Sequence, residues 1–152
     1  MSHFSQIQSS FTNKLALKRA LERLGFTPEV YEQATELVNT WGDYSEAEII
    51  LRRQTISEDS PCRADLGFQW DPESACYKIV ADSYEFDNST LKKTFQNLEN
   101  FQAQLTVAYE LEMLPILYNK SSFDIAEPIQ HENGSYTVMI TQKLDPYAEV
   151  TV

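Results

Sequence analysis

Two histidines are the residues best suited to acid–base chemistry in this sequence, because imidazole titrates near neutral pH. His3 stands in the opening segment Met1-Ser2-His3-Phe4-Ser5, and His131 stands beside a predicted hairpin turn. A histidine that acts as a general base needs a nucleophile or proton donor within hydrogen-bond reach. The sequence contains no G-x-S-x-G nucleophile elbow. We therefore interpret His3 as a structural residue first and a catalytic candidate second, and we expect His131 to be exposed.

Metal and redox chemistry would fall to the two histidines and two cysteines, Cys62 and Cys76. No two of these four residues have the short spacing of a zinc site. The sequence therefore predicts no metal and no cofactor. The hairpin proposed below would separate the thiols by about 23 Å of strand, whereas a disulfide needs Cα atoms within about 7 Å. We expect both cysteines to stay reduced and to serve packing.

Asp65 and Asp82 flank the same predicted hairpin and are the candidate pair of catalytic carboxylates. The predicted register instead places Asp82 opposite Arg63 and Asp65 opposite Val80. A cross-strand ion pair is the simpler interpretation. The four glycines are too far apart for a phosphate-binding loop.

Aromatic residues make up 12% of the chain, and four of them are candidates for contacts with another protein. They are Trp41, Tyr44, Trp70 and Tyr84. Tryptophan and tyrosine are enriched at the centres of protein interfaces. The alternative for each is a place in the hydrophobic core.

The formal net charge of −11 is the most informative feature of the composition. Such a charge repels nucleic acid and anionic membrane surfaces, so neither is an expected partner. No apolar run approaches the about 20 residues of a membrane span, and the opening segment is too polar for a secretory signal. With only two cysteines, the chain fits a reducing compartment.

The first half of the chain predicts a strand, a helix and further strands. Residues 3–11 favour a strand, and Thr12 or Asn13 can cap a helix whose apolar stripe ends before Gly25. Residues 27–45 are ambiguous between helix and strand. Residues 47–51 alternate and favour a strand, and residues 55–61 form a polar loop.

The clearest hairpin pairs residues 66–70 with residues 76–86 around the turn 71–74. If Phe68 faces Tyr77, then Trp70 faces Ala75 and one face is consistently apolar. A long helix is then predicted from Ser89 or Thr90, with a break or kink at Pro115.

Residues 123–130 and 135–142 predict a last hairpin around a two-residue turn at Asn133-Gly134. Residues 144–152 are expected to form a surface tail. The predicted order is β-α-β-β-β-β-α-β-β. It indicates a single α+β domain over residues 1–152, with a mainly antiparallel sheet and two helices packed on one face.

Four segments in this order resemble a family of hypothetical chloroplast reading frames, the thirty-fifth of that series. They are residues 1–5, 21–26, 64–68 and 77–82. The resemblance extends from Met1 to about Gln142, and the family is shared by plastids, cyanobacteria, other bacteria and phages. It implies a cyanobacterial cytoplasmic or plastid stromal protein of a photosynthetic lineage, with no established activity. In the family the stretch matching residues 35–41 looks extended, which favours a strand there.

Two functions fit these observations. The first is a non-enzymatic protein-interaction module, such as an adaptor, assembly factor or regulator, that docks an unknown protein partner through its aromatic surface. The second is a small-molecule-binding protein or enzyme with a cleft near His3. A deep pocket at His3 would favour the second, and a shallow exposed aromatic patch would favour the first.

Overall fold

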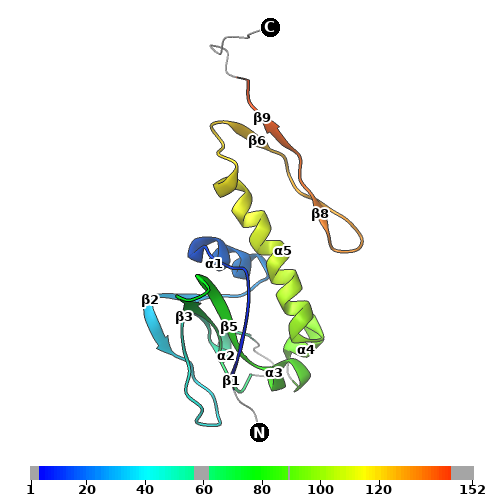
Figure 1. Ribbon diagram of the computed structural model, residues 1–152. Helices are drawn as coiled ribbons and strands as arrows, with labels where there is room; N and C mark the ends of the chain where they lie inside the picture. The colour runs from blue at the N-terminus through cyan, green and yellow to red at the C-terminus, as the bar shows by residue number, and fades with distance from the viewer. Residues whose placement is uncertain (1–3, 57–61, 89, 145–152) are drawn as a thin grey trace. The chain divides into compact units, whose positions relative to one another are not determined.

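A computed structural model describes residues 4–56, 62–88 and 90–144 of the chain (Figure 1). His3 lies outside these ranges, as do residues 57–61 and most of the expected C-terminal tail. The chain divides into two compact units, residues 1–109 and residues 110–152. The single-domain organisation stays a prediction.

Five antiparallel strands form the sheet of the first unit. They are β1 (Phe4–Ile7), β2 (Glu29–Glu36), β3 (Glu46–Leu51), β4 (Leu66–Asp71) and β5 (Cys76–Asp82), in the order β1-β5-β4-β3-β2. The first strand is shorter than predicted. The ambiguous stretch is extended only to Glu36, and beyond it a single bridge pairs Asn39 with Ala64.

Helix α1 (Lys14–Arg23) begins and ends where the local signals predict. The side chain of Asn13 accepts a hydrogen bond from the backbone N–H of Ala16 at 2.9 Å. At the other end Gly25 takes a φ of +95°, and the N–H of Phe26 bonds the carbonyl of Leu21.

One face of the sheet packs against α1 and the first part of α5 (Leu98–Leu117). Ile49, Phe68 and Ile79 share this face because they are paired across three strands. The Phe11 ring lies between Phe68 and Tyr109, with centroid distances of 6.5 and 5.0 Å. The predicted α+β fold, with a mainly antiparallel sheet and two helices, is confirmed.

The opposite face carries a second apolar cluster, made of Leu37, Ala47, Ile50 and Val80. Gly67 lies beneath it, and a Cβ atom there would come within 2.8 Å of the Cβ of Ala47. The sheet is therefore covered on both faces at this point, which explains the uninterrupted buried run in β3.

The register of the β4–β5 hairpin was predicted wrongly, by two residues. Phe68 pairs with Ile79, and Trp70 pairs with Tyr77. The reason is that Ala75 takes a φ of 54° and belongs to the turn rather than to the strand. The Asp71 side chain stabilises this longer turn by accepting hydrogen bonds from the Glu73 N–H and the Ser74 hydroxyl.

The register from which the separation of the two cysteines was argued was wrong, but the observed register still places them toward opposite ends of the hairpin. Neither cysteine is joined in a disulfide in the structure, and their reduced state stays a prediction. Cys76 opens β5 opposite Asp71, whereas Cys62 is buried before the other end of β4.

Three short helices were not predicted as separate elements: the first two replace parts of the predicted loop and return strand, and the third is the first part of the predicted long helix. They are α2 (Arg53–Ile56), α3 (Ser83–Asn88) and α4 (Thr90–Phe95). The return strand stops at Asp82 because its side chain accepts a hydrogen bond from the Tyr84 N–H and caps α3. The predicted long helix is interrupted at Gln96, whose φ is 70°. It does not break at Pro115, which lies inside α5.

The second unit contains two short antiparallel pairs, β6 (Phe123–Ile125) with β9 (Ile140–Gln142) and β7 (Ile129–Gln130) with β8 (Tyr136–Thr137). The turn has three residues rather than the two predicted, since the His131 N–H bonds the carbonyl of Ser135. Gly134 takes the left-handed φ of +84° that such a loop requires. His131 is exposed, as predicted.

Candidate functional site

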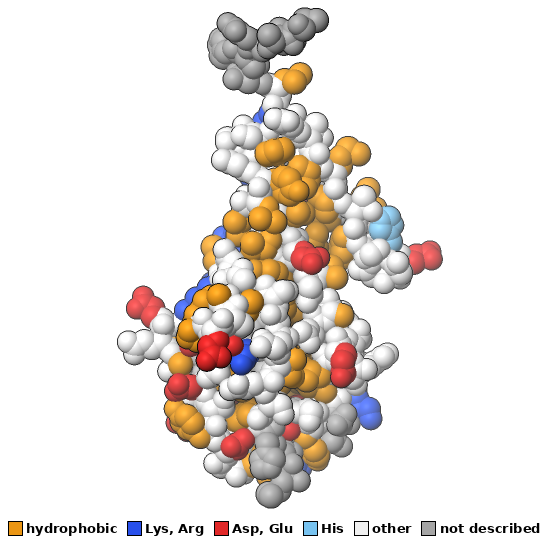
Figure 2. All heavy atoms as spheres, viewed as in Figure 1, with side chains coloured by type: hydrophobic (Ala, Val, Ile, Leu, Met, Phe, Trp, Pro, Cys, Tyr) orange, Lys and Arg blue, Asp and Glu red, His pale blue; other side chains and the backbone are white. Residues whose placement is uncertain are grey.

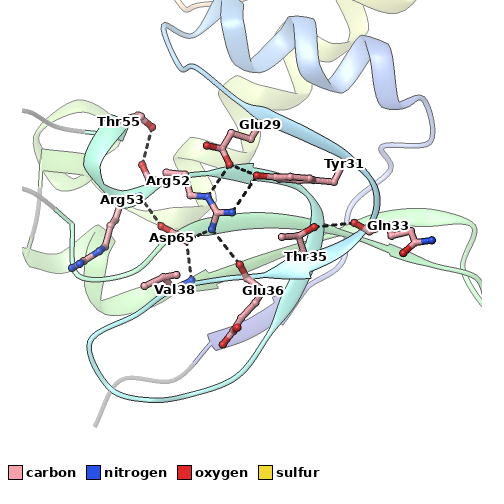
Figure 3. Close-up of polar contacts among 10 residues, drawn as sticks. All are labelled: Glu29, Tyr31, Gln33, Thr35, Glu36, Val38, Arg52, Arg53, Thr55 and Asp65. Atoms are coloured by element: carbon pink, nitrogen blue, oxygen red, sulfur yellow. Dashed lines mark hydrogen bonds and ion pairs between the residues drawn. The ribbon is translucent and has the colours of Figure 1, made fainter.

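Arg52, at the end of β3, is the centre of a polar network that joins three segments (Figure 3). Its guanidinium donates to Asp65 at 2.9 Å, to Glu29 at 2.8 Å and to the carbonyl of Glu36 at 3.1 Å. Burial would lower the pKa of Arg52, but hydrogen bonds with Tyr31, Glu29 and Asp65 outweigh it and raise that pKa. The arginine therefore stays charged.

Asp65 is the buried partner in this network, and its side chain is 1% exposed. Besides Arg52 it accepts backbone N–H groups from Val38 at 2.8 Å and Arg53 at 2.7 Å. The sequence interpretation placed Asp65 opposite Val80, and this was wrong because the β4–β5 register is shifted by two residues, so that Gly67 pairs with Val80. Asp82 pairs with Phe4 of β1 rather than facing Arg63.

The segments 38–43 and 62–65 lie side by side because backbone groups join them. The Asp65 N–H bonds the carbonyl of Val38 at 2.9 Å, and the Thr40 N–H bonds that of Arg63 at 3.0 Å. Within the first segment, the Asn39 side chain accepts from the N–H groups of Trp41 and Asp43. The loop is therefore held in one conformation.

This arrangement brings together a surface group that we call the Trp41 cluster, defined as Trp41, Arg63 and Tyr84. The Cζ atom of Arg63 lies 5.5 Å from the Trp41 ring centroid and 5.6 Å from that of Tyr84. The two rings meet edge to face at 6.4 Å. Trp41 is 44% exposed, so the cluster presents an aromatic face and a cation to solvent.

Buried carboxylates lie behind the Trp41 cluster. Asp65, Asp82 and Glu85 are each less than 5% exposed, and the hollow that they line has no room for a water molecule. Ligand pockets are larger, at about 300–1,000 Å³. In the part of the chain that the structure describes, no three histidine, cysteine or acidic residues are arranged to hold a metal ion.

Residues 20–139 match the family described as protein of unknown function (DUF1257). The chain belongs to this family. Searches of curated proteins and of solved structures found no significant match. Over the described ranges of this DUF1257 protein, no helix is long and apolar enough to cross a membrane.

Glu85 is a buried carboxyl that holds the backbone of the Trp41 cluster in place. It accepts the backbone N–H of Arg63 at 2.9 Å. Burial raises the pKa of Glu85, and the negative charge of Asp82 raises it further. Hydrogen bonds from the Arg63 N–H and the Cys62 thiol oppose the rise. The folded state therefore binds a proton at this carboxyl more tightly than the unfolded state does.

We expect Glu85→Gln to become more stable than the natural protein as the pH rises. A carboxyl whose folded pKa exceeds its unfolded value binds more protons when folded, so stability is lost as the pH rises above about 4.3. Glutamine keeps an oxygen for the Arg63 N–H and does not titrate. Thermal unfolding of both proteins from about pH 4 to pH 8 should show a growing difference. A difference that stays constant with pH would contradict this.

The four predicted aromatic candidates fall into two places. Trp41 and Tyr84 meet in the Trp41 cluster, and Tyr44 lies on the same loop with 65% exposure. Trp70 packs against Tyr77 at the far end of β4. Arg63 was missed as a member of the cluster because both of its aromatic neighbours are distant in the sequence.

Proposed function

We propose that this protein is a non-enzymatic interaction module, an adaptor, assembly or regulatory factor that docks a protein partner through the Trp41 cluster. The supporting observation is the Arg63 guanidinium. Among the described residues it stacks on two aromatic rings but forms no ion pair or hydrogen bond. Arginine, tryptophan and tyrosine are the residue types enriched in interface hot spots, and here an exposed arginine is already positioned beside the other two.

The loop on which Trp41 stands extends this surface. Val38 and Tyr44 are 47% and 65% exposed, so three large apolar side chains of one loop face solvent. The Asn39 hydrogen bonds fix the loop before binding, which lowers the ordering cost of association. Arg63 would take a carboxylate of the partner in a planar, two-point contact.

The proposed setting is the cytoplasm of a cyanobacterium or the stroma of a plastid. The support is the resemblance of residues 1–5, 21–26, 64–68 and 77–82 to the chloroplast reading-frame family. The partner is therefore to be sought in an extract of a photosynthetic host.

The test compares capture by the tagged natural protein with capture by Trp41→Ala and Arg63→Lys, using quantitative mass spectrometry. A partner of the Trp41 cluster should lose at least about 2 kcal/mol of binding free energy, or about 30-fold in affinity, when Trp41 is truncated. Arg63→Lys keeps the charge but loses the planar stacking, so it should also weaken binding.

Leu15→Ala is the matched control, since Leu15 is 50% exposed on α1 and belongs to no part of the cluster. It should capture the partner as well as the natural protein does. If every captured protein is retained by Trp41→Ala, the proposed surface is wrong.

A further inference from the structure

The second unit exposes an unusual amount of apolar surface. From Glu110 to Leu144 no described side chain is buried. Its exposed large apolar side chains are Ile116, Leu117, Tyr118, Ile129, Tyr136, Met139 and Leu144. Figure 2 shows hydrophobic side chains gathered on the visible face of this region, with few charged ones among them. A two-stranded hairpin without a covered face is marginally stable in water.

The two edges of the hairpin differ in composition. The strand segment 123–130 carries Asp124, Glu127 and Pro128, whereas the segment 136–142 contains neither a charged residue nor a proline. Natural proteins protect a free edge with charges, proline or a bulge. The first edge has such protection and the second has none.

The bulge of the hairpin also lies on the segment 123–130, which we call the protected strand. Ile129 pairs with Thr137, and the Ala126 N–H bonds the carbonyl of Met139 at 2.9 Å. The protected strand thus advances three residues, from 126 to 129, where the other strand advances two, from 139 to 137. The extra residue falls at Glu127–Pro128, so the segment 136–142 remains regular.

The hydrogen bonds show which backbone groups of this segment remain available. Ser135, Met139 and Lys143 bond inward to the protected strand. Because antiparallel ladders alternate, the N–H and C=O groups of residues 136, 138, 140 and 142 point outward. They form a row that is symmetric about Met139.

We propose that the segment 136–142 pairs antiparallel with the same segment of a second copy of the chain, with Met139 at the twofold axis. In this register Val138 bonds Ile140 of the partner subunit, and Tyr136 bonds Gln142 of the partner subunit. Every outward group then has a partner, and the two hairpins form one four-stranded sheet.

The absence of charge on the edge is what selects a second copy as the occupant. Like charges that face each other across two strands are destabilising, and an uncharged segment meets none when it pairs with itself. Antiparallel self-pairing of the protected strand would instead bring Asp124 and Glu127 close to the carboxylates of the second copy. This pairing is independent of the Trp41 cluster, so either proposal can fail alone.

The first test introduces a thiol at the axis, with Met139→Cys. Met139 lies between outward-bonding residues, so the two copies would meet there as a non-hydrogen-bonded pair with Cα atoms about 4.5 Å apart. A disulfide accepts that distance. Oxidised glutathione should convert the variant to a covalent dimer, with peptide mapping to distinguish the new bond from Cys62 and Cys76.

Ile129→Cys is the matched control, because Ile129 is 62% exposed on the protected strand. It should remain monomeric under the same oxidant. Equal cross-linking of the two variants, or none with Met139→Cys, would overturn the proposal.

The second test measures the mass in solution by sedimentation. The natural protein should form dimers as its concentration rises, and added salt should favour them by screening the repulsion between two chains of charge −11. Met139→Lys places two ammonium groups at the axis and should abolish dimers, whereas Met139→Thr should retain them. A natural protein that stays monomeric at every concentration and salt level, or a Met139→Lys that dimerises equally, would refute the pairing.

Discussion

Asp65→Ala is expected to lower the free energy of unfolding by about 3–5 kcal/mol, the usual cost of removing one partner from a buried charge pair. The side chain is 1% exposed and accepts three hydrogen bonds. Its loss leaves the Arg52 guanidinium partly unpaired and two backbone N–H groups without acceptors. Thermal unfolding should shift down by about 6–20 °C, at about 2–4 °C per kcal/mol for a chain of this size.

Glu29→Gln is the control for this prediction. Glu29 also bonds Arg52, but its side chain is 45% exposed. Exposed ion pairs contribute about 1 kcal/mol or less. A loss from Glu29→Gln as large as that from Asp65→Ala would show that the network, rather than burial of one carboxylate, sets the cost.

A double variant separates the charge pair from the backbone anchors. Asp65→Leu with Arg52→Met removes both charges, which relieves the unpaired guanidinium. The N–H groups of Val38 and Arg53 still lose their acceptor. We therefore expect partial recovery only. Full recovery would mean that these two hydrogen bonds contribute little to stability.

Local signals predicted the elements of the first unit that depend on neighbouring residues. Asn13 and Gly25 delimit α1 because a cap and a left-handed residue act within one turn of the helix. Two further local signals were missed. Asp82 and Glu85 have the spacing of a helix cap, and Asn97 accepts the N–H of Asn100 at the start of α5.

Contacts between distant segments were not predictable in the same way. The type of Trp41 and Tyr84 indicated an interface role, but their meeting with Arg63 depends on how segments 38–43 and 62–65 pair. That pairing depends in turn on Asp65, whose predicted neighbours were wrong because one residue of a turn, Ala75, was assigned to a strand. A shift of two residues preserved the apolar face and changed every cross-strand partner.

Phe101→Ala is expected to cost about 3–5 kcal/mol, the range for truncating a fully buried phenylalanine. Phe101 is 0% exposed in α5. Its ring lies 5.1 Å from that of Phe95, 5.4 Å from that of Phe86 and 6.0 Å from that of Phe26. One residue thus joins four helical or loop segments, and alanine would leave a cavity that these rings line.

Phe101→Leu separates the loss of volume from the loss of aromatic geometry. A hydrophobic exchange of similar volume should cost less than about 1.5 kcal/mol, and edge-to-face pairs add about 0.5–1.5 kcal/mol beyond burial. Denaturant unfolding of both variants measures the two contributions. If Phe101→Leu destabilises as much as Phe101→Ala, the ring contacts rather than the filled volume hold α3, α4 and α5 together.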